Sequence, residues 1–479
     1  MKQVISVVAF ILAVCANAQW TVVNLNPAGS SQSVAYGVSG GQQVGYAYGF
    51  RASLWSGTAE SWVDLHPAVA TESNARCVGD GQQVGYARVD DVRRASLWSG
   101  TAGSWVNLNP AGATYSEAHG VGGGQQVGRA DVGSVGRASL WSGTAGSWVD
   151  LHPAGASQST AYGVDGGKQV GWVILGGVQR ASLWTGTAGS RVDLHPAGAT
   201  YSEARGVHGG YQVGSTHEAT FVTTRAALWS GTAGSWVDLH PAGATYSIAY
   251  GVDGGQQVGD AFVGSNFRAS LWSGTAASWV NLDEFLSASF ASSEARGVWH
   301  DGAFTYVVGT GFNVTTNRSE ALMWVSRSIA PTSYSTVRGT AFSGNLASLL
   351  NSDNNRLVIR PGFVFSVGEP PVQVRLNATA PTASPNGFSF SVESSASFGN
   401  AQQKVWLWNY VIDDYELLDT RLATTTDDVV TVTVRSDPSR FIQPGTLAIR
   451  ALVSFRAVGP AFAYPWSGRI DKVWWHFPG

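Results

Sequence analysis

Hydrophobic and polar residues alternate in short runs along most of the chain, and the same pattern returns at intervals of about 43 residues. In the second copy the alternation predicts four β-strands, over residues 75–78, 83–87, 94–98 and 104–108. Gly-rich segments separate the strands and predict tight turns. A period of about 40–45 residues with four short strands is typical of β-propeller blades.

Two columns of aromatic residues mark the repeats. We expect the two members of each copy to face one another across a hairpin as an aromatic pair, with Arg191 stacking on Trp184. The first column is Trp55, Trp98, Trp141, Trp184, Trp229, Trp272 and Trp324, and the second is Trp20, Trp62, Trp105, Trp148, Arg191, Trp236 and Trp279.

The first and last copies are incomplete in complementary ways. Residues 20–25 carry only the fourth-strand motif, whereas residues 294–298, 305–309 and 321–325 supply only the first three strands of the last copy. Adding the first segment to the last copy would close a ring and remove exposed sheet edges. The sequence therefore predicts a seven-bladed β-propeller over residues 19–326. A linear β-solenoid is the alternative, but it needs atypical capping repeats.

The repeat stops after Val325, and the chain changes character. Residues 327–334, which include Pro331, predict a linker. Residues 335–479 contain eight further alternating runs and turn signals such as Pro-Gly and Asn-Gly, which predict a β-sandwich or jelly roll. The predicted runs are 356–360, 372–376, 387–393, 404–411, 415–421, 429–434, 447–455 and 469–476. The fold class expected for the whole chain is all-β.

The repeated motif also resembles a known type. Ala-Ser-Leu-Trp-Ser-Gly, then Trp-Val-Asp-Leu, then Gly-Gly-Gln-Gln-Val-Gly is similar to the HAF-type extracellular repeat of secreted bacterial proteins. The similarity extends over about two-thirds of the chain. This chain has Arg-Ala-Ser where that repeat has His-Ala-Phe, and His-Pro where it has a Gly-rich segment. The resemblance implies an extracellular bacterial repeat protein without an established chemistry.

The N-terminus has the three parts of a secretory signal peptide. Lys2 is followed by an apolar run over residues 4–14 and by Ala16-Asn17-Ala18, so residues 1–18 predict a signal and Gln19 the mature start. Cys15 raises a lipoprotein alternative, which Val14 disfavours because a small residue is needed there. We expect a secreted or cell-surface protein. Cys77 alone remains after cleavage, so no internal disulfide is expected.

Composition narrows the partners. The chain has 59 Gly and 20 Trp among 479 residues, 13% charged residues and a net charge of −3. So many aromatic residues exclude disorder, and the weak charge without a basic cluster argues against nucleic acid. Beyond the signal, no segment is apolar for the roughly 18 residues that a membrane span needs. We expect a monomer whose partner is a glycan or a surface protein.

No catalytic motif is found, and no cofactor or metal is expected. One histidine per copy, in a His-Pro step, occupies a place that Asn26 and Asn109 fill elsewhere, which favours a turn role over metal binding. One arginine per copy is expected to pack on a tryptophan or to pair with an Asp. The histidines are His66, His152, His195 and His240, and the arginines are Arg51, Arg94, Arg137, Arg180, Arg225 and Arg268.

Residues that vary between near-identical copies are the best candidates for a ligand site, because packing fixes the others. One such position lies near the predicted start of the innermost strand, where aromatic or basic residues would ring the mouth of the central channel. Tyr, Arg and His at such a mouth suit sugars or peptides. A freely drifting solvated face is the alternative. The candidate ligand-binding residues are Tyr36, Arg76, His119, Tyr162, Arg205, Tyr250 and Arg296.

The sequence leaves three functions open. The first is a non-catalytic binding or scaffold protein. The second is a glycan-active hydrolase or lyase at the channel mouth, for which two carboxylates about 5–9.5 Å apart would be needed. Glu117, Glu203 and Glu294 are the candidates, although they fall in separate copies. The third is a structural surface or matrix component without a defined ligand.

Overall fold

The computed structural model describes residues 20–218, 223–301, 303–350, 354–366, 368–385, 387–458 and 466–478. The predicted signal peptide over residues 1–18 and the predicted mature start at Gln19 lie outside these residues. The described residues form strands, turns and short 3-10 helices, so the protein is all-β as predicted. Within the same ranges, no helix is long and apolar enough to cross a membrane.

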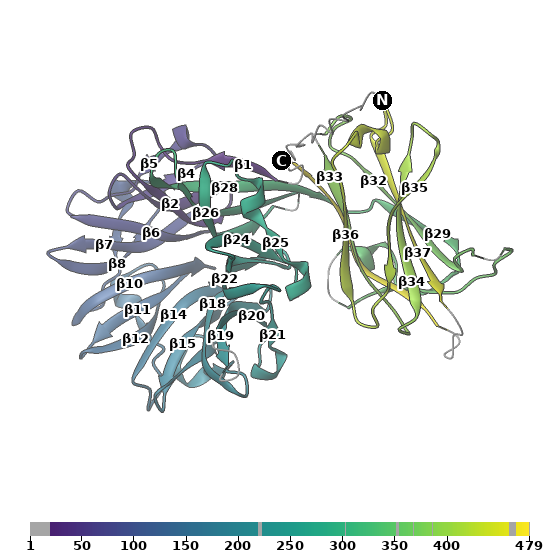
Figure 1. The fold of residues 1–479 in the computed structure, drawn as a ribbon. Coiled ribbons are helices and arrows are strands. Elements are labelled where there is room, and N and C mark those ends of the chain that lie inside the picture. The colour runs from purple at the N-terminus through teal and green to yellow at the C-terminus, as the bar shows by residue number, and fades with distance from the viewer. Residues whose placement is uncertain are drawn as a thin grey trace, which may run out of the picture.

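The N-terminal part contains six four-stranded antiparallel sheets in a β-propeller-type arrangement (Figure 1). Their strands are β2 (Ser33–Ser39), β3 (Gln42–Ala47), β4 (Arg51–Trp55) and β5 (Val63–Asp64); β6 (Glu72–Gly79), β7 (Gln82–Val89), β8 (Val92–Trp98) and β9 (Val106–Asn107); β10 (Ala113–Gly122), β11 (Gln125–Val132), β12 (Val135–Trp141) and β13 (Val149–Asp150); β14 (Gln158–Asp165), β15 (Lys168–Leu175), β16 (Val178–Trp184) and β17 (Val192–Asp193); β18 (Ala199–His208), β19 (Tyr211–Glu218), β20 (Thr224–Trp229) and β21 (Val237–Asp238); β22 (Ala244–Asp253), β23 (Gln256–Val263), β24 (Asn266–Trp272) and β25 (Val280–Asn281).

The turns follow from the repeated glycines. Gly40 and Gly41 join β2 to β3 with φ angles of 57° and 76°, the conformation that a two-residue hairpin turn requires at both central positions. Each third strand is followed by a single turn of 3-10 helix, which leaves only two residues for the fourth strand. These helices are η1 (Ala59–Ser61), η2 (Ala102–Ser104), η3 (Ala145–Ser147), η4 (Ala188–Ser190), η5 (Ala233–Ser235) and η6 (Ala276–Ser278), and η7 (Leu282–Phe285) follows the last short strand, β25.

A further sheet joins the start of the described chain to the end of the repeats. Strands β26 (Phe290–His300), β27 (Phe304–Asn313) and β28 (Arg318–Ile329) pair in order, and β1 (Thr21–Asn24) pairs antiparallel with β28. The amide of Ala321 in β28 donates to Ser33 Oγ in the first sheet at 2.9 Å. The amide of Ala138 donates in the same way to Ser159 Oγ of the following sheet, at 2.8 Å.

The first tryptophan column forms the packing between sheets. All seven of its members are fully buried. Trp98, for example, packs in one cluster with Val44 and Leu54 of the preceding sheet and Val78 of its own. The column therefore stabilises each pair of neighbouring sheets by burying apolar surface.

The second column differs from the prediction of cross-hairpin aromatic pairs. Among the described residues, no ring contact joins the two columns, and five of the seven members of the second column donate a hydrogen bond to a serine instead. Trp105 Nε1 donates to Ser96 Oγ at 2.9 Å, and Arg191 Nε donates to Ser182 Oγ at the same distance. The expected stacking of Arg191 on Trp184 is therefore replaced by a copy of the tryptophan hydrogen bond.

The C-terminal part is a sandwich of two sheets. One sheet pairs β36 (Asp428–Val434), β33 (Phe388–Ala396), β38 (Gly468–Pro478), β31 (Leu357–Arg360) and β30 (Thr340–Ser343). The other has the order β29 (Ser333–Arg338), β32 (Val372–Thr379), β37 (Ala448–Ala457), β34 (Ala401–Asn409) and β35 (Asp414–Leu422). Two 3-10 helices, η8 (Leu346–Leu349) and η9 (Pro438–Phe441), complete the part. One core cluster, with Phe388, Phe455 and Trp475, fills the space between the sheets.

The junction between the two parts is a shared strand where a linker over 327–334 was expected. Strand β28 pairs with β1 over Leu322–Val325 and then with β38 over Ser326–Ile329. Strand β29 begins at Ser333, so only residues 330–332 lie between strands. Pro331 falls in this gap, where its missing amide interrupts no ladder.

Candidate functional site

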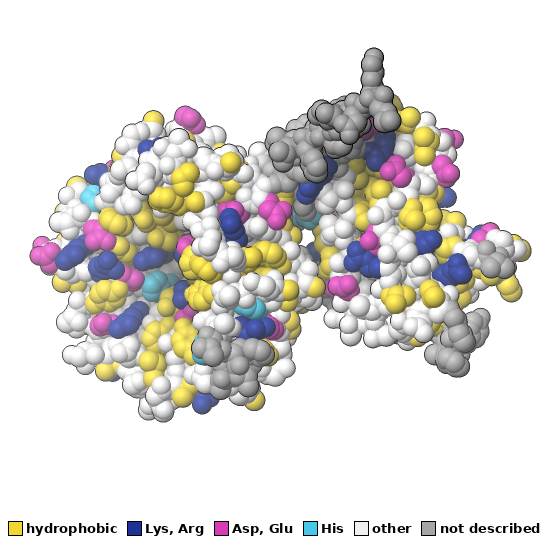
Figure 2. Space-filling view, viewed as in Figure 1, with side chains coloured by type: hydrophobic (Ala, Val, Ile, Leu, Met, Phe, Trp, Pro, Cys, Tyr) yellow, Lys and Arg dark blue, Asp and Glu magenta, His cyan; other side chains and the backbone are white. Residues whose placement is uncertain are grey.

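The seven predicted ligand-binding residues line one cavity of about 480 Å³ in the centre of the N-terminal part. Each comes from the first strand of its sheet, in the order β2, β6, β10, β14, β18, β22 and β26. Figure 2 shows the hollow, with His and Lys or Arg side chains inside its rim. We call Tyr36, Arg76, His119, Tyr162, Arg205, Tyr250 and Arg296 the channel ring.

The channel ring lies deeper than the sequence suggested. Its residues are in the middle or second half of their strands, not near the start, and each falls at a β-bulge. In β10, for example, Ala118 pairs with Gly128 and Gly120 with Val127, which leaves His119 without an opposite residue. A bulge of this kind re-aims a side chain, and here it accompanies the placing of His119 at the cavity wall.

The residue after each ring position explains how the inner strands come so close together. It is glycine in six copies. A Cβ on Gly120 would lie 2.5 Å from the carbonyl oxygen of Tyr162 in the next sheet, so a side chain does not fit there. The second copy has Cys77, which lines the cavity. Burial raises the pKa of the Cys77 thiol, which disfavours a reactive thiolate.

Cations and aromatic rings alternate along part of the channel ring. The Arg205 guanidinium lies 5.1 Å from the centre of the Tyr162 ring and 5.2 Å from that of Tyr250. Arg296 lies 4.2 Å from the Tyr250 ring on its other side. The His119 and Tyr162 ring centres are 5.1 Å apart. These contacts hold the side chains in place, so the polar edges they present to the cavity are preorganised.

Arg76 differs from the other two arginines of the channel ring. Its guanidinium lies 5.1 Å from the Tyr36 ring and 5.7 Å from the Tyr86 ring. In the described part of the chain, Arg76 makes no ion pair within 4 Å, and its buried Nε has no hydrogen-bond partner. The cavity wall therefore carries a positive charge that no neighbouring carboxylate neutralises directly.

The candidate carboxylates lie beside the ring, two residues earlier on the same strands, and each is paired with an arginine. The pKa of Glu117 is lowered despite its burial, because His119, Tyr115, Arg76 and Arg93 favour its charged form. Glu117 receives its arginine from the third strand of the preceding sheet. The three pairs are Glu117 with Arg93 (2.9 Å), Glu203 with Arg205 (2.6 Å) and Glu294 with Arg296.

His119, which lines the cavity, and Asp260, which is buried beside Tyr250 and Arg296, have strongly shifted pKa values. Burial, reinforced by the positive charges of Arg76 and Arg205, lowers the pKa of His119 to about 4 despite the opposing effect of Glu117. The imidazole is therefore neutral at pH 7. Burial also raises the pKa of Asp260 to about 6, against the lowering effect of Arg296. Asp260 is 3% exposed, and the burial that shifts its pKa could not be predicted from the sequence.

The far end of the cavity carries a different set of polar residues. His208 Nε2 lies 3.0 Å from Asp253 Oδ1, and His208 Nδ1 lies 3.9 Å from Asp165 Oδ1. Asp165 also accepts a hydrogen bond from the amide of Gly209, and Asp253 accepts one from the amide of His300. These residues fix the hairpin ends of neighbouring sheets relative to one another.

The repeated histidines and arginines have structural contacts. His152 Nδ1 lies 2.8 Å from Ser159 Oγ and its Nε2 lies 3.1 Å from the Ala156 carbonyl oxygen, which closes the turn after the short fourth strand. Asn109 makes equivalent bonds, so an amide replaces an imidazole there. Arg137 pairs with Asp150 at 2.7 Å. These contacts agree with the turn and ion-pair roles expected from the sequence.

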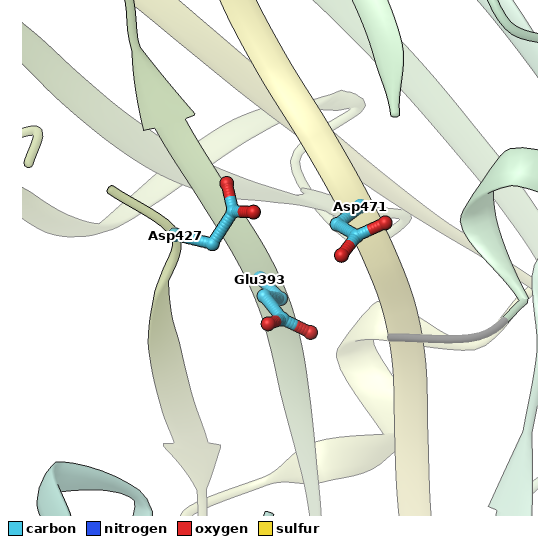
Figure 3. Close-up of side chains that lie close together, drawn as sticks. All are labelled: Glu393, Asp427 and Asp471. Atoms are coloured by element: carbon cyan, nitrogen blue, oxygen red, sulfur yellow. The ribbon is translucent and has the colours of Figure 1, made fainter. Parts of the chain in front are cut away.

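Two further features of the structure were not anticipated. Glu393 of β33, Asp427 just before β36 and Asp471 of β38 bring carboxylate oxygens within 4.8 Å of one another in the sandwich (Figure 3). Arg356 pairs with Asp427 at 2.5 Å and partly neutralises the cluster. A second cavity, of about 460 Å³, lies between the two parts and is lined by Trp20 and Trp279 on one side and by Trp474 on the other.

Comparisons with known proteins give structural neighbours only. Neither a protein-family model nor a curated protein sequence matches the chain. TolB from Agrobacterium tumefaciens is 12% identical with a TM-score of 0.36, over 46% of this chain and 87% of its own. TolB from Acinetobacter baumannii is 9% identical with a TM-score of 0.33, over 61% and 63%. A family 29 carbohydrate-binding module is 14% identical with a TM-score of 0.19, over 31% and 89%. At these scores the likeness carries no argument about function.

Proposed function

We propose that this chain is a secreted or cell-surface binding protein without catalytic activity, and that its channel ring binds a glycan carrying carboxylate groups. The observation that carries the proposal is the convergence of three arginines, three tyrosines and one histidine on a single cavity. All seven occupy the position that varies between otherwise similar copies. Arginine binds carboxylates with paired hydrogen bonds, and tyrosine offers both a ring face and a hydroxyl.

The charge of Arg76 favours an acidic glycan over a neutral one. Arg205 and Arg296 already face Glu203 and Glu294, so their charges are largely compensated. Arg76 sits between the Tyr36 and Tyr86 rings with its Nε unsatisfied. A ligand carboxylate at this point would satisfy the guanidinium and lie beside two aromatic rings, which are suited to a sugar.

We infer that the N-terminal part is a seven-bladed propeller closed by its first strand. The pairing of β1 with β28 supports closure, as does the Ala321 to Ser33 bond, which repeats the contact between consecutive sheets. The resemblance to HAF-type repeats and the signal-like N-terminus support an extracellular location. In this arrangement the channel ring is held by every sheet at once, so it is a rigid site.

The test compares Arg76 with an arginine of the same sheet that lies outside the channel ring. Binding of oligogalacturonate and of neutral cellohexaose to the full chain is measured by isothermal titration calorimetry. We expect Arg76→Ala to weaken oligogalacturonate binding at least about tenfold, because a charged hydrogen bond is lost. Arg94→Ala serves as the control and should change it less than about twofold. Equal effects of the two variants, or no binding of any acidic glycan, would overturn the proposal.

A glycan-active lyase or hydrolase is the second candidate, and Asp260 is the observation that favours it. A buried carboxyl with a pKa of about 6 can exchange a proton near neutral pH. It neighbours Tyr250 and Arg296 of the channel ring, which would contact the ligand. Release of unsaturated or reducing ends from polygalacturonate by the full chain, abolished in Asp260→Asn, would replace binding by catalysis as the function.

A further inference from the structure

The outward face of the five-stranded sheet in the sandwich has an unusual set of side chains. In β34, Val405 and Leu407 point into the core, so Lys404, Trp406 and Trp408 point outward. The register of the ladders places the outward residues of the other strands beside them. The outward positions are Ser333, Ser335 and Arg338; Gln373, Arg375, Asn377 and Thr379; Arg450, Leu452, Ser454 and Arg456; Gln402, Lys404, Trp406 and Trp408; and Tyr415, Leu417, Thr420 and Leu422.

These positions include five cationic residues and no Asp or Glu. Arg338 alone among them has a carboxylate partner, Glu369, at 2.7 Å. Lys404, Arg375 and Arg450 make no ion pair within 4 Å in the described ranges. The chain as a whole has a net charge of −3, so this positive face is not a reflection of its overall composition.

Aromatic rings lie next to these cations. Trp408 packs against Tyr415 with ring centres 4.9 Å apart, and the Arg450 guanidinium lies 5.3 Å from the Trp408 ring. The Lys404 ammonium lies 5.6 Å from the Trp406 ring. Since Trp406 and Trp408 are two residues apart on one strand, their side chains lie about 7 Å apart along the sheet. The face thus presents a line of rings flanked by positive charges.

Several polar atoms on this face lack partners. Trp406 Nε1, Tyr415 OH and Arg375 Nε have no hydrogen-bond partner among the described residues. Arg450 Nε, in contrast, donates to Asn377 Oδ1 at 3.2 Å. Three unsatisfied donors on one sheet face are unusual, because polar groups that are shielded from water are normally paired. A ligand that carries many acceptors, and that shifts the surrounding side chains slightly, would supply the missing partners.

We propose that this face is a second binding site, for an acidic polysaccharide chain. The apolar face of a pyranose packs on a tryptophan ring, while carboxylates and hydroxyls bind arginine, lysine and amide groups. An extended chain matches the line of rings across the open sheet, whereas the channel ring suits a short segment or a chain end. The positive charge, with no Asp or Glu among the outward strand positions, selects anionic chains over neutral ones. This inference is independent of the function proposed for the channel ring.

The test uses the full chain and retardation in native gels that contain either polygalacturonate or neutral hydroxyethylcellulose. We expect polygalacturonate to retard the protein and Trp406→Ala and Arg450→Ala each to weaken this interaction at least about fivefold. Arg435→Ala is the matched control, because Arg435 directly follows β36 of the other sheet and lines the cavity between the two parts. Lys404→Glu, a surface charge reversal that removes no core atom, keeps the test valid if Trp406→Ala fails to fold.

The outcomes separate this site from the channel ring. In an Arg76→Ala background, which removes the channel-ring contact, Trp406→Ala and Arg450→Ala should still each weaken retardation by polygalacturonate at least about fivefold, because they act at a separate site. The proposal is overturned if Arg450→Ala and Lys404→Glu bind as the unmodified chain does, or if hydroxyethylcellulose retards the protein equally. It is also overturned if single-stranded DNA competes as well as the acidic polysaccharide, which would indicate a general anion surface.

Discussion

The repeat part and the sandwich bury apolar surface in different ways. The repeat part has one small cluster at each sheet boundary, each built around a fully buried tryptophan, such as Trp98 or Trp141. The sandwich has one large cluster without internal repetition. In the repeats, a residue that departs from its six equivalents is visible at once. In the sandwich nothing within the chain distinguishes a binding residue from a neutral one, so its candidate face emerged only from the strand register.

Removing a tryptophan from one sheet boundary should have the largest effect. Trp141 is fully buried, and its Nε1 has no hydrogen-bond partner in the described residues, so it acts through packing. We expect Trp141→Ala to lower the free energy of unfolding by about 3–5 kcal/mol. Urea denaturation followed by circular dichroism measures the change. A loss below about 1 kcal/mol would mean that neighbouring clusters compensate, and the boundaries would not be separate units.

The junction between the two parts should be sensitive to acid. His476 of β38 lies with its Nδ1 2.9 Å from Ser328 Oγ of β28. Burial lowers the pKa of His476 to about 3 from its ordinary value of 6.5. Because the unfolded chain binds the proton more readily, stability is full above pH 6.5 and falls as the pH drops towards 3.

The loss expected from His476 at pH 4 is at most about 3 kcal/mol. Urea denaturation at pH 7 and pH 4 measures it, and His476→Gln should flatten the decline because glutamine does not titrate. His217→Gln, in the repeat part, is the control. An unchanged pH profile in His476→Gln would show that other groups dominate the acid response.

Much of the fold could be predicted because its signals are local. All eight strands predicted for the sandwich are present, and the Gly-Gly turns and repeat period follow directly from the sequence. The linker prediction was wrong because residues such as Arg327 and Ser328 have no strand pattern of their own; they extend β28 only because β38 lies beside them. The strands β29 and β30 were missed for a similar reason, since much of β29 and all of β30 are exposed and carry no alternating apolar face.

An intermediate effect is expected from the polar contact between sheets. Ser159 is buried, accepts a hydrogen bond from the Ala138 amide at 2.8 Å and contacts His152 at 2.8 Å. Ser159→Ala would leave a buried amide without a partner, so we expect a loss of about 1–3 kcal/mol in urea denaturation. The exposed Ser142→Ala is the control and should be nearly neutral. If Ser159→Ala and Ser142→Ala both had small effects, the buried tryptophan alone would stabilise the contact between the sheets.

The candidate residues of the channel ring could be predicted because seven copies provide an internal comparison. The depth of these residues in the channel could not be predicted, because a β-bulge depends on how two strands pair and cannot be recognised in the sequence of one strand. Asp260 was missed for a related reason. Its position varies between copies and so could be noticed, but the burial that raises its pKa depends on the folded sheets.

The smallest effect should come from restoring a tryptophan at Arg191. Its Nε already reproduces the tryptophan hydrogen bond to Ser182 Oγ, at 2.9 Å, and its Nη2 lies 3.3 Å from Asp193. Arg191→Trp would keep the hydrogen bond and bury more apolar surface. It would lose the ion pair with Asp193, which would still pair with Arg180 at 3.2 Å. We expect a gain in stability below about 1 kcal/mol in urea denaturation. The reverse change, Trp148→Arg, is the matched control and should lower the free energy of unfolding. It removes buried apolar surface, and Asp150 already has an ion-pair partner in Arg137. If Arg191→Trp were instead strongly destabilising, the copies would not be interchangeable units, and the contrast between a repeated and a unique core would fail at this sheet.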